Sequence, residues 1–276
     1  MTAPAMVVFT DLDGTLLNHH SYSFKEAKPA LDLLKKEGIP WLFNTSKTFA
    51  ELQQLRLELE NPWPMIVENG SGIAIPDTAE SNRVFPPNRI DFPSEQRQGF
   101  HFYSLGLARA EFLPRLDFLK SKYDFLGYQD MSVEQLAEET GLSLESAEMS
   151  MDRQYTEPCI WKDTDQAFES FRDELDSMGL LCVRGGRFAH IMGKTDKGSA
   201  LKWVMRHFFA ESKHCSVALG DGENDLAMLN SADVAILVRS PVQGLPGPCS
   251  AKKTVVTKDI GPAGWAGAII ALLEER

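Results

Sequence analysis

Short apolar runs alternate with amphipathic stretches through the first third of the chain. The runs cover residues 6–9, 39–43 and 65–67 and are rich in β-forming side chains, so each predicts a strand. Between them, apolar residues recur at helical spacing around residues 30–34, and again after Thr48, which forms a capping-box pattern with Glu51. The glycine-rich stretch 68–75 predicts a turn or a small hairpin.

The last third of the chain repeats this rhythm. We predict a helix over 197–209, a strand over 216–219, a helix near residue 224, strands over 234–238 and 254–256, and a final helix after Pro262. Apolar strands that alternate with helices are typical of a parallel sheet covered on both faces. The pattern therefore predicts an α/β fold with a Rossmann-like parallel sheet and a ligand site at the carboxyl ends of its strands.

The middle of the chain has a different pattern. Residues 85–193 contain proline-rich turns and amphipathic helices, and they predict a strand pair at 159–161 and 188–192. We interpret this stretch as an inserted α+β cap domain. Residues 1–84 and 194–276 would then form the core.

Composition narrows the class of protein. Hydrophobic residues make up 43% and charged residues 24% of the 276 residues, which is ordinary for a globular protein. A net charge of −11 argues against a nucleic-acid partner, because such proteins need many cations to displace counterions from phosphates. The four cysteines are widely spaced and predict neither a zinc site nor disulfides. No leader segment or run of eighteen apolar residues is visible, so we expect a cytoplasmic protein without a membrane partner.

Two carboxylates follow the first predicted strand, in the sequence Asp11-Leu12-Asp13-Gly14-Thr15. Residues two apart at a strand end can face the same side, so Asp11 and Asp13 can share one site. Asp11 is well placed to act as a nucleophile toward a phosphoryl group, with Asp13 as the general acid and base. An Asp-x-Asp pair alone is more often a solvated loop, but the apolar strand before it and Gly14 after it favour the catalytic interpretation.

Further polar groups stand at other predicted strand ends and at one helix start. Thr45 follows the second strand, where a hydroxyl can hold phosphate oxygens. Lys197 begins a helix, where a cation is unfavourable unless an anion partners it. Residues 220–225, Gly-Asp-Gly-Glu-Asn-Asp, follow a later strand, and Mg²⁺ prefers such hard oxygen ligands. Calcium binding of the EF-hand type is not favoured, because the twelve-residue ligand spacing is missing.

These elements, in this order, resemble the haloacid dehalogenase superfamily of phosphohydrolases, over the whole predicted core. The resemblance implies that Asp11 is the nucleophile and Asp13 the acid and base, with Thr45 and Lys197 binding phosphate. It also implies a magnesium site formed by Asp11, Asp13 through its backbone carbonyl, Asp221 and Asp225. The long insertion is similar to a C2-type cap, and the Glu68-Asn69-Gly70 turn is similar to that of the Cof-like branch.

Several short strings are closer still to mannosyl-3-phosphoglycerate phosphatases: Thr45-Ser46-Lys47-Thr48, Thr140-Gly141-Leu142-Ser143, Ile160-Trp161, Gly186-Arg187-Phe188 with His190, and Gly261-Pro262-x-Gly264-Trp265. Such a substrate carries a carboxylate besides its phosphate and needs additional cations. Lys47 and Arg187 are the candidates, with Ser46 beside them and with Glu68 and Asn69 for hydroxyls. His190 is equally well explained as a core histidine of the cap.

Other functions fit parts of the same sequence. A phosphatase for glucosyl-3-phosphoglycerate or for sugar phosphates in general fits the same motifs, and a phosphomutase fits them less well. Residues 132–152 superficially resemble a DNA-binding helix-turn-helix, but the second helix is acidic and lacks base-reading side chains. The expected partner is a small phosphorylated sugar or glycerate, and the sequence predicts no oligomeric state.

Overall fold

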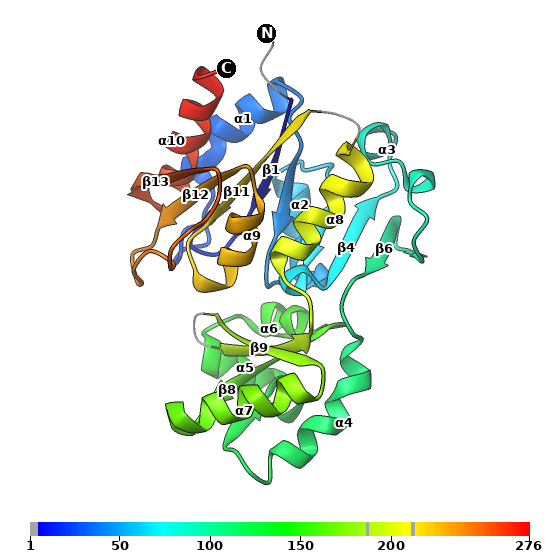
Figure 1. The fold of residues 1–276 in the computed structure, drawn as a ribbon, viewed down its shortest axis with the longest axis vertical. Coiled ribbons are helices and arrows are strands. Elements are labelled where there is room, and N and C mark those ends of the chain that lie inside the picture. The colour runs from blue at the N-terminus through cyan, green and yellow to red at the C-terminus, as the bar shows by residue number, and fades with distance from the viewer. Residues whose placement is uncertain (1–4, 186–187, 211–212) are drawn as a thin grey trace.

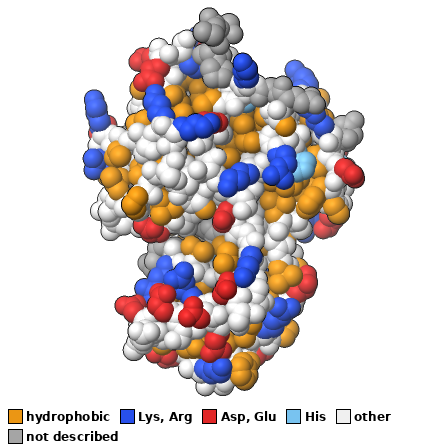
Figure 2. Space-filling model, in the orientation of Figure 1, with side chains coloured by type: hydrophobic (Ala, Val, Ile, Leu, Met, Phe, Trp, Pro, Cys, Tyr) orange, Lys and Arg blue, Asp and Glu red, His pale blue; other side chains and the backbone are white. Residues whose placement is uncertain are grey.

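The computed structural model describes residues 5–185, 188–210 and 213–276 and has two lobes (Figure 1). The larger lobe contains a nine-stranded sheet and both ends of the chain, and the smaller lobe contains a four-stranded sheet. Figure 2 shows that the surface narrows between the two lobes and that basic, acidic and apolar side chains are interspersed over this face.

Six strands of the large sheet run parallel, in the order β13-β12-β11-β1-β2-β3. Their bounds are β1 (Ala5–Thr10), β2 (Trp41–Asn44), β3 (Met65–Val67), β11 (His214–Gly220), β12 (Val234–Arg239) and β13 (Lys253–Ile260). The strands in the middle of this group are buried on both faces, which is why they are apolar throughout. The predicted α/β fold with its parallel sheet is confirmed.

Three antiparallel strands extend the sheet beyond β3. Strand β4 (Gly72–Pro76) forms the predicted hairpin with β3, and β6 (Phe100–Ser104) and β5 (Glu95–Arg97) follow it. Strands β5 and β6 lie within the stretch predicted as cap, yet they pair with the core sheet. We therefore propose that the inserted domain begins near residue 107 and ends near residue 193.

Helices accompany the strands of the larger lobe. They are α1 (Lys28–Lys36), α2 (Phe49–Glu58), α3 (Ala79–Val84), α8 (Lys197–Phe209), α9 (Leu226–Ser231) and α10 (Gly261–Glu274). Helix α1 packs beside α10, and α8 packs beside α9 (Figure 1). Gly198 allows the second contact, because a Cβ there would lie 2.2 Å from the Ala227 carbonyl oxygen.

The smaller lobe is an antiparallel sheet with helices. Its strands, in the order β7-β8-β10-β9, are β7 (Phe125–Gly127), β8 (Thr156–Trp161), β10 (Phe188–Gly193) and β9 (Leu180–Gly185). Its helices are α4 (Arg109–Leu119), α5 (Val133–Thr140), α6 (Leu144–Met151) and α7 (Asp165–Ser177). The segment resembling a helix-turn-helix forms α5 and α6, and α6 docks on the core, where Thr48 Oγ1 donates to the Met149 carbonyl at 2.8 Å. In the described part of the chain, no helix is both long and apolar enough to cross a membrane.

Candidate active site

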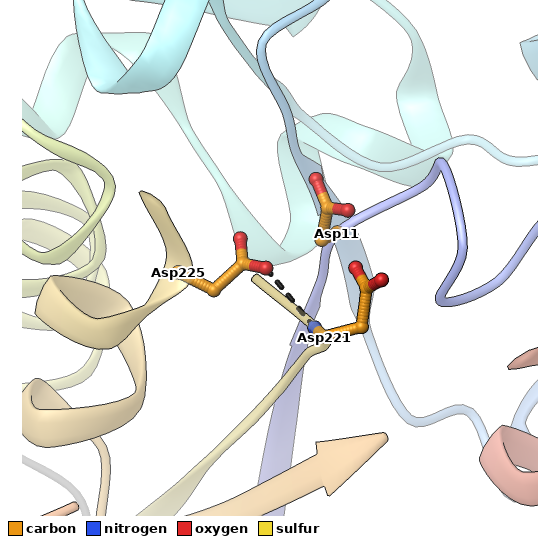
Figure 3. A group of neighbouring side chains, drawn as sticks. All are labelled: Asp11, Asp221 and Asp225. Carbon is orange, nitrogen blue, oxygen red and sulfur yellow. Dashed lines mark hydrogen bonds between the residues drawn. The ribbon is translucent and has the colours of Figure 1, made fainter. Parts of the chain in front are cut away.

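The carboxyl ends of neighbouring parallel strands bring three acidic side chains together. Asp11 follows β1, Asp221 follows β11, and the two strands are hydrogen-bonded neighbours. Asp225 lies one turn beyond Asp221, in the 3-10 helix Glu223–Asp225 (Figure 3). One carboxylate oxygen from each residue lies within 4.8 Å of the other two, and all three side chains are buried. Residues more than 200 positions apart thus meet as the sequence predicts.

Lys197 links two of these acids. Its Nζ lies 2.6 Å from Asp11 Oδ1 and 2.7 Å from Asp225 Oδ1, and its side chain is fully buried. It is the first residue of α8, and the Asn44 side chain holds its backbone carbonyl at 2.9 Å. The cation at a helix start is therefore explained by two carboxylates.

Asp225 and Asp221 are held in different ways. Asp225 Oδ2 accepts hydrogen bonds from the backbone N–H groups of Asp221 and Gly222, at 3.1 and 3.0 Å, so both of its oxygens have partners. Asp221 is held by Thr15 and Gln243 at 3.2 and 3.3 Å, through longer and weaker bonds. Asp221 is thus better placed to bind an ion, while Asp225 fixes Lys197 and the loop.

Gly14 lets the chain pass close to Asp221. Its φ of +83° is in the left-handed region, and a Cβ at this position would lie 2.6 Å from Asp221 Oδ2. A hydrogen bond also fixes the end of β1: the indole N–H of the buried Trp265 donates to Thr10 Oγ1 at 3.0 Å. The Gly-Pro-x-Gly-Trp string near the end of the chain therefore has a structural role next to Asp11.

The electrostatics of the cluster suit a divalent cation. Burial and the neighbouring Asp225 charge raise the pKa of Asp11 well above its usual range, although Lys197 opposes them. Burial and Asp225 likewise raise the pKa of Asp221. Lys197 pairs with two of the three buried carboxylates, Asp11 and Asp225, so an additional cation that binds oxygen ligands would relieve the remaining repulsion. The residues present therefore fit Mg²⁺.

Asp13 points from the same loop toward the cavity between the lobes. Its Oδ2 lies 3.0 Å from Lys47 Nζ, and among the described residues its buried Oδ1 has no hydrogen-bond partner. Lys47 Nζ also lies 3.5 Å from Glu51 Oε1. Burial lowers the pKa of Lys47, but the carboxylates of Asp13 and Glu51 outweigh burial, so the net effect raises its pKa. The Thr45 side chain is buried, and its Oγ1 accepts a hydrogen bond from the backbone N–H of Lys47 at 3.3 Å.

The residues predicted to bind substrate do not all lie at the cavity. Ser46 and Lys47 line the cavity. Glu68, predicted to bind a hydroxyl, instead accepts hydrogen bonds from the backbone N–H groups of residues 154–156 and from Thr156 Oγ1, at 2.8–3.0 Å. Asn69 is buried in the same turn with φ +57°, and Arg187 lies outside the described residues. We therefore propose that Glu68 joins the lobes rather than binding substrate.

Both lobes contribute to a cavity of about 690 Å³ above the acids. Its core side includes Asp11, Asp13 and Asp221, and its cap side includes Tyr128, Arg153 and His190. Sequence reasoning missed Arg153 because it stands in a short loop without a periodic pattern. It left out His190, whose position on a predicted strand gave no sign that the ring reaches the cavity.

Comparisons with known proteins agree with this geometry. Residues 8–245 match the family described as haloacid dehalogenase-like hydrolase. The chain is 35% identical over 279 residues to the glucosyl-3-phosphoglycerate/mannosyl-3-phosphoglycerate phosphatase of Persephonella marina, and the alignment covers 98% of each protein. It is also 35% identical over 272 residues to the protein of the same name from Methanococcoides burtonii, covering 97% of both.

Solved structures share the fold at low sequence identity. A Thermoplasma acidophilum protein superimposes with a TM-score of 0.69 at 12% identity, covering 98% of this chain and 99% of the other. The sucrose-phosphatase of Synechocystis sp. superimposes with a TM-score of 0.58 at 12% identity, covering 98% of each chain.

The chain belongs to the haloacid dehalogenase-like hydrolase family. Within it, the protein is a phosphoric monoester hydrolase, as its relatives at 35% identity are phosphatases.

Proposed function

We propose that this enzyme is a magnesium-dependent phosphatase acting on mannosyl-3-phosphoglycerate, with glucosyl-3-phosphoglycerate as the alternative substrate. The observation that carries the proposal is the meeting of Asp11, Asp221 and Asp225 within 4.8 Å, with Asp11 and Asp221 lining a cavity between the lobes. The relatives named for both substrates support the substrate class, since they match along almost the whole chain.

In the first half of the proposed reaction, Asp11 attacks phosphorus. Lys197 holds Oδ1, which leaves Oδ2 to form the new P–O bond. The ester P–O bond breaks, and Asp13 donates a proton to the departing sugar-glycerate oxygen. The products of this half are the free alcohol and an aspartyl-phosphate on Asp11.

The second half hydrolyses the aspartyl-phosphate. Asp13, now a carboxylate, accepts a proton from a water molecule as the water oxygen bonds to phosphorus. The P–O bond to Asp11 breaks, which releases inorganic phosphate and restores the carboxylate. In this proposal, Thr45 and Lys197 hold the phosphate oxygens during both halves.

Asp11, the Asp13 carbonyl and Asp221 would hold Mg²⁺, and Asp225 would keep Lys197 in place. When bound, the ion supplies positive charge that reduces repulsion between the Asp11 carboxylate and the phosphate dianion. The chain's own part is to bury the carboxylates, fix Lys197 and cover the site with the cap.

The cavity supports a substrate with a sizeable leaving group. A space of about 690 Å³ lies within the range of cavities that enclose small organic ligands. Its cap side presents Tyr128, Arg153 and His190, which suit a ligand with hydroxyl and anionic groups. A general phosphatase would be expected to need fewer such contacts.

The test is phosphate release from a panel of esters: the mannosyl and glucosyl substrates, glucose 6-phosphate and p-nitrophenyl phosphate, with and without EDTA. We expect kcat/KM to be highest for the two glycosyl-phosphoglycerates, and activity to disappear with EDTA and return with Mg²⁺. Equal rates on all four esters would remove the substrate assignment, and full activity in EDTA would remove the metal.

A further inference from the structure

Arg153 is a buried cap-side cation that is held on one side only. Its Nε donates to the Ser150 carbonyl at 2.9 Å, and its Nη1 donates to the Ser46 carbonyl at 3.2 Å and to Thr156 Oγ1 at 2.8 Å. The guanidinium also lies over the Tyr128 ring, 5.4 Å from its centroid. Its plane is therefore fixed before any ligand arrives.

The other terminal nitrogen of Arg153 is available. Among the described residues, no hydrogen bond engages Nη2, and its closest carboxylate oxygen, Glu51 Oε2, is 4.0 Å away. That oxygen already accepts the Thr48 N–H at 2.8 Å as part of the capping box of α2. Nη2 thus has two N–H donors, and the side chain lines the cavity.

His190 lies in the same wall of the cavity and is also incompletely paired. It is 8% exposed, and its buried Nδ1 has no hydrogen-bond partner among the described residues. Burial and the charges of Arg153 and Lys197 lower the pKa of His190 to about 3, so the ring is neutral at physiological pH. It can donate one N–H without adding charge.

We propose that Arg153 and His190 form a cap-side subsite that binds the carboxylate of the substrate, at a distance from the phosphate held by Lys197 and Thr45. The inference rests on the proposed phosphatase function and names the partner of the second anionic group. A carboxylate fits because a fixed Arg N–H pair and a neutral N–H donor supply hydrogen bonds and a single positive charge.

Lys47 is less suited to the same task. Its ammonium group already faces the carboxylates of Asp13 and Glu51, at 3.0 and 3.5 Å, and would have to exchange partners. Arg153 Nη2 faces a single carboxylate, Glu51, at the longer distance of 4.0 Å, and among the described residues it donates no hydrogen bond to it. Its bond to the Ser46 carbonyl also joins the cap to the loop that carries Thr45, so a ligand on Arg153 engages both lobes.

The test compares mannosyl-3-phosphoglycerate with its carboxamide, which has the same shape but no carboxylate charge. We expect wild-type enzyme to prefer the acid by about 10–100-fold in kcat/KM, the range expected for charge-assisted hydrogen bonds. Arg153→Lys should reduce this preference to about threefold or less, because the planar fork is lost. His190→Asn, a second variant that leaves the Arg153 bonds intact, should reduce it partly. Arg172→Lys, on the exposed face of α7 and paired with Glu169, is the control and should keep the full preference.

The outcomes separate the two proposals. If wild-type enzyme hydrolyses neither ester, the proposed function fails. If it hydrolyses both equally well, or if Arg153→Lys lowers both rates by the same factor, the subsite assignment fails while the phosphatase assignment stands. Calorimetric binding of the phosphate-free product, mannosylglycerate, adds a measurement without catalysis: about tenfold weaker binding by the Arg153 variant supports the subsite, and unchanged binding refutes it.

Discussion

Replacing Gly14 by alanine tests whether the chain must pass this close to Asp221. The added Cβ would lie 2.6 Å from Asp221 Oδ2, whereas ordinary contacts begin near 3.4 Å. The carboxylate would have to retreat by roughly 0.8 Å, and displacements of about 1 Å can reduce catalysis by about 100-fold. The left-handed backbone at Gly14, with φ +83°, adds about 1–2 kcal/mol of strain.

The chain offers a matched control for that strain. Gly99, in the hairpin between β5 and β6, has φ +75°, and a Cβ there would meet nothing within 4 Å. Gly99→Ala should therefore lose a similar amount of unfolding free energy without touching the site. The difference between the two variants isolates the effect of the contact with Asp221.

The assay is Mg²⁺ binding by calorimetry together with phosphate release over a Mg²⁺ titration. We expect Gly14→Ala to bind Mg²⁺ about 10–100-fold more weakly and to lose about 100-fold in kcat/KM. Gly99→Ala should match wild type in both. Wild-type Mg²⁺ affinity in the Gly14 variant, or an equal loss in the two variants, would refute the role assigned to this close approach.

Four other changes have defined outcomes. Asp11→Asn should abolish phosphate release and acid-stable phosphoenzyme labelling while circular dichroism stays unchanged; measurable turnover would end the nucleophile assignment. Mg²⁺ should raise the melting temperature of wild-type protein and EDTA should reverse this, whereas Asp221→Asn should show little response. Glu68→Gln should lower the unfolding free energy, measured by urea titration, by about 3 kcal/mol, because it weakens several hydrogen bonds to a charged group. The control Glu37→Gln, at an exposed position, should lower it by less than about 0.5 kcal/mol. His190 takes up a proton near pH 6.5 when unfolded but only at about 3 when folded, so unfolding free energy should fall as pH drops through this window. His190→Asn should make that fall shallower, and an unchanged pH profile would contradict the buried neutral ring.

The predicted cap boundary shows where local pattern is insufficient. Residues 85–104 have the turn-rich character of an insertion, but strands β5 and β6 within them pair with β4 on the core sheet. Pairing partners of an antiparallel strand are set by long-range contacts that a sequence window does not contain. The same holds for Glu68, whose partners at residues 154–156 lie nearly ninety positions away.

The cap side of the cavity shows the same limit at the level of single residues. Nothing in the local sequence distinguishes Arg153 from the other arginines of the cap, such as Arg172 and Arg184, which pair with acids on the surface. Its burial and its unused Nη2 follow from the docking of α6 and β8 against the core. Lys47 and Arg187, by contrast, stand in strings that the sequence alone makes recognisable.

The sequence by itself determined the parallel core, the strand-end positions of Asp11, Thr45 and Asp221, and the helix start at Lys197. It could do so because strand ends in a parallel sheet meet at one edge, whatever the chain does between them. Only the tertiary structure decided that Lys197 bridges two acids, that Glu68 accepts hydrogen bonds from the chain entering β8, and that Arg153 and His190 line the same cavity as Asp11. Those contacts depend on how two separately formed lobes dock, and side-chain distances across that junction are not encoded in any local periodicity.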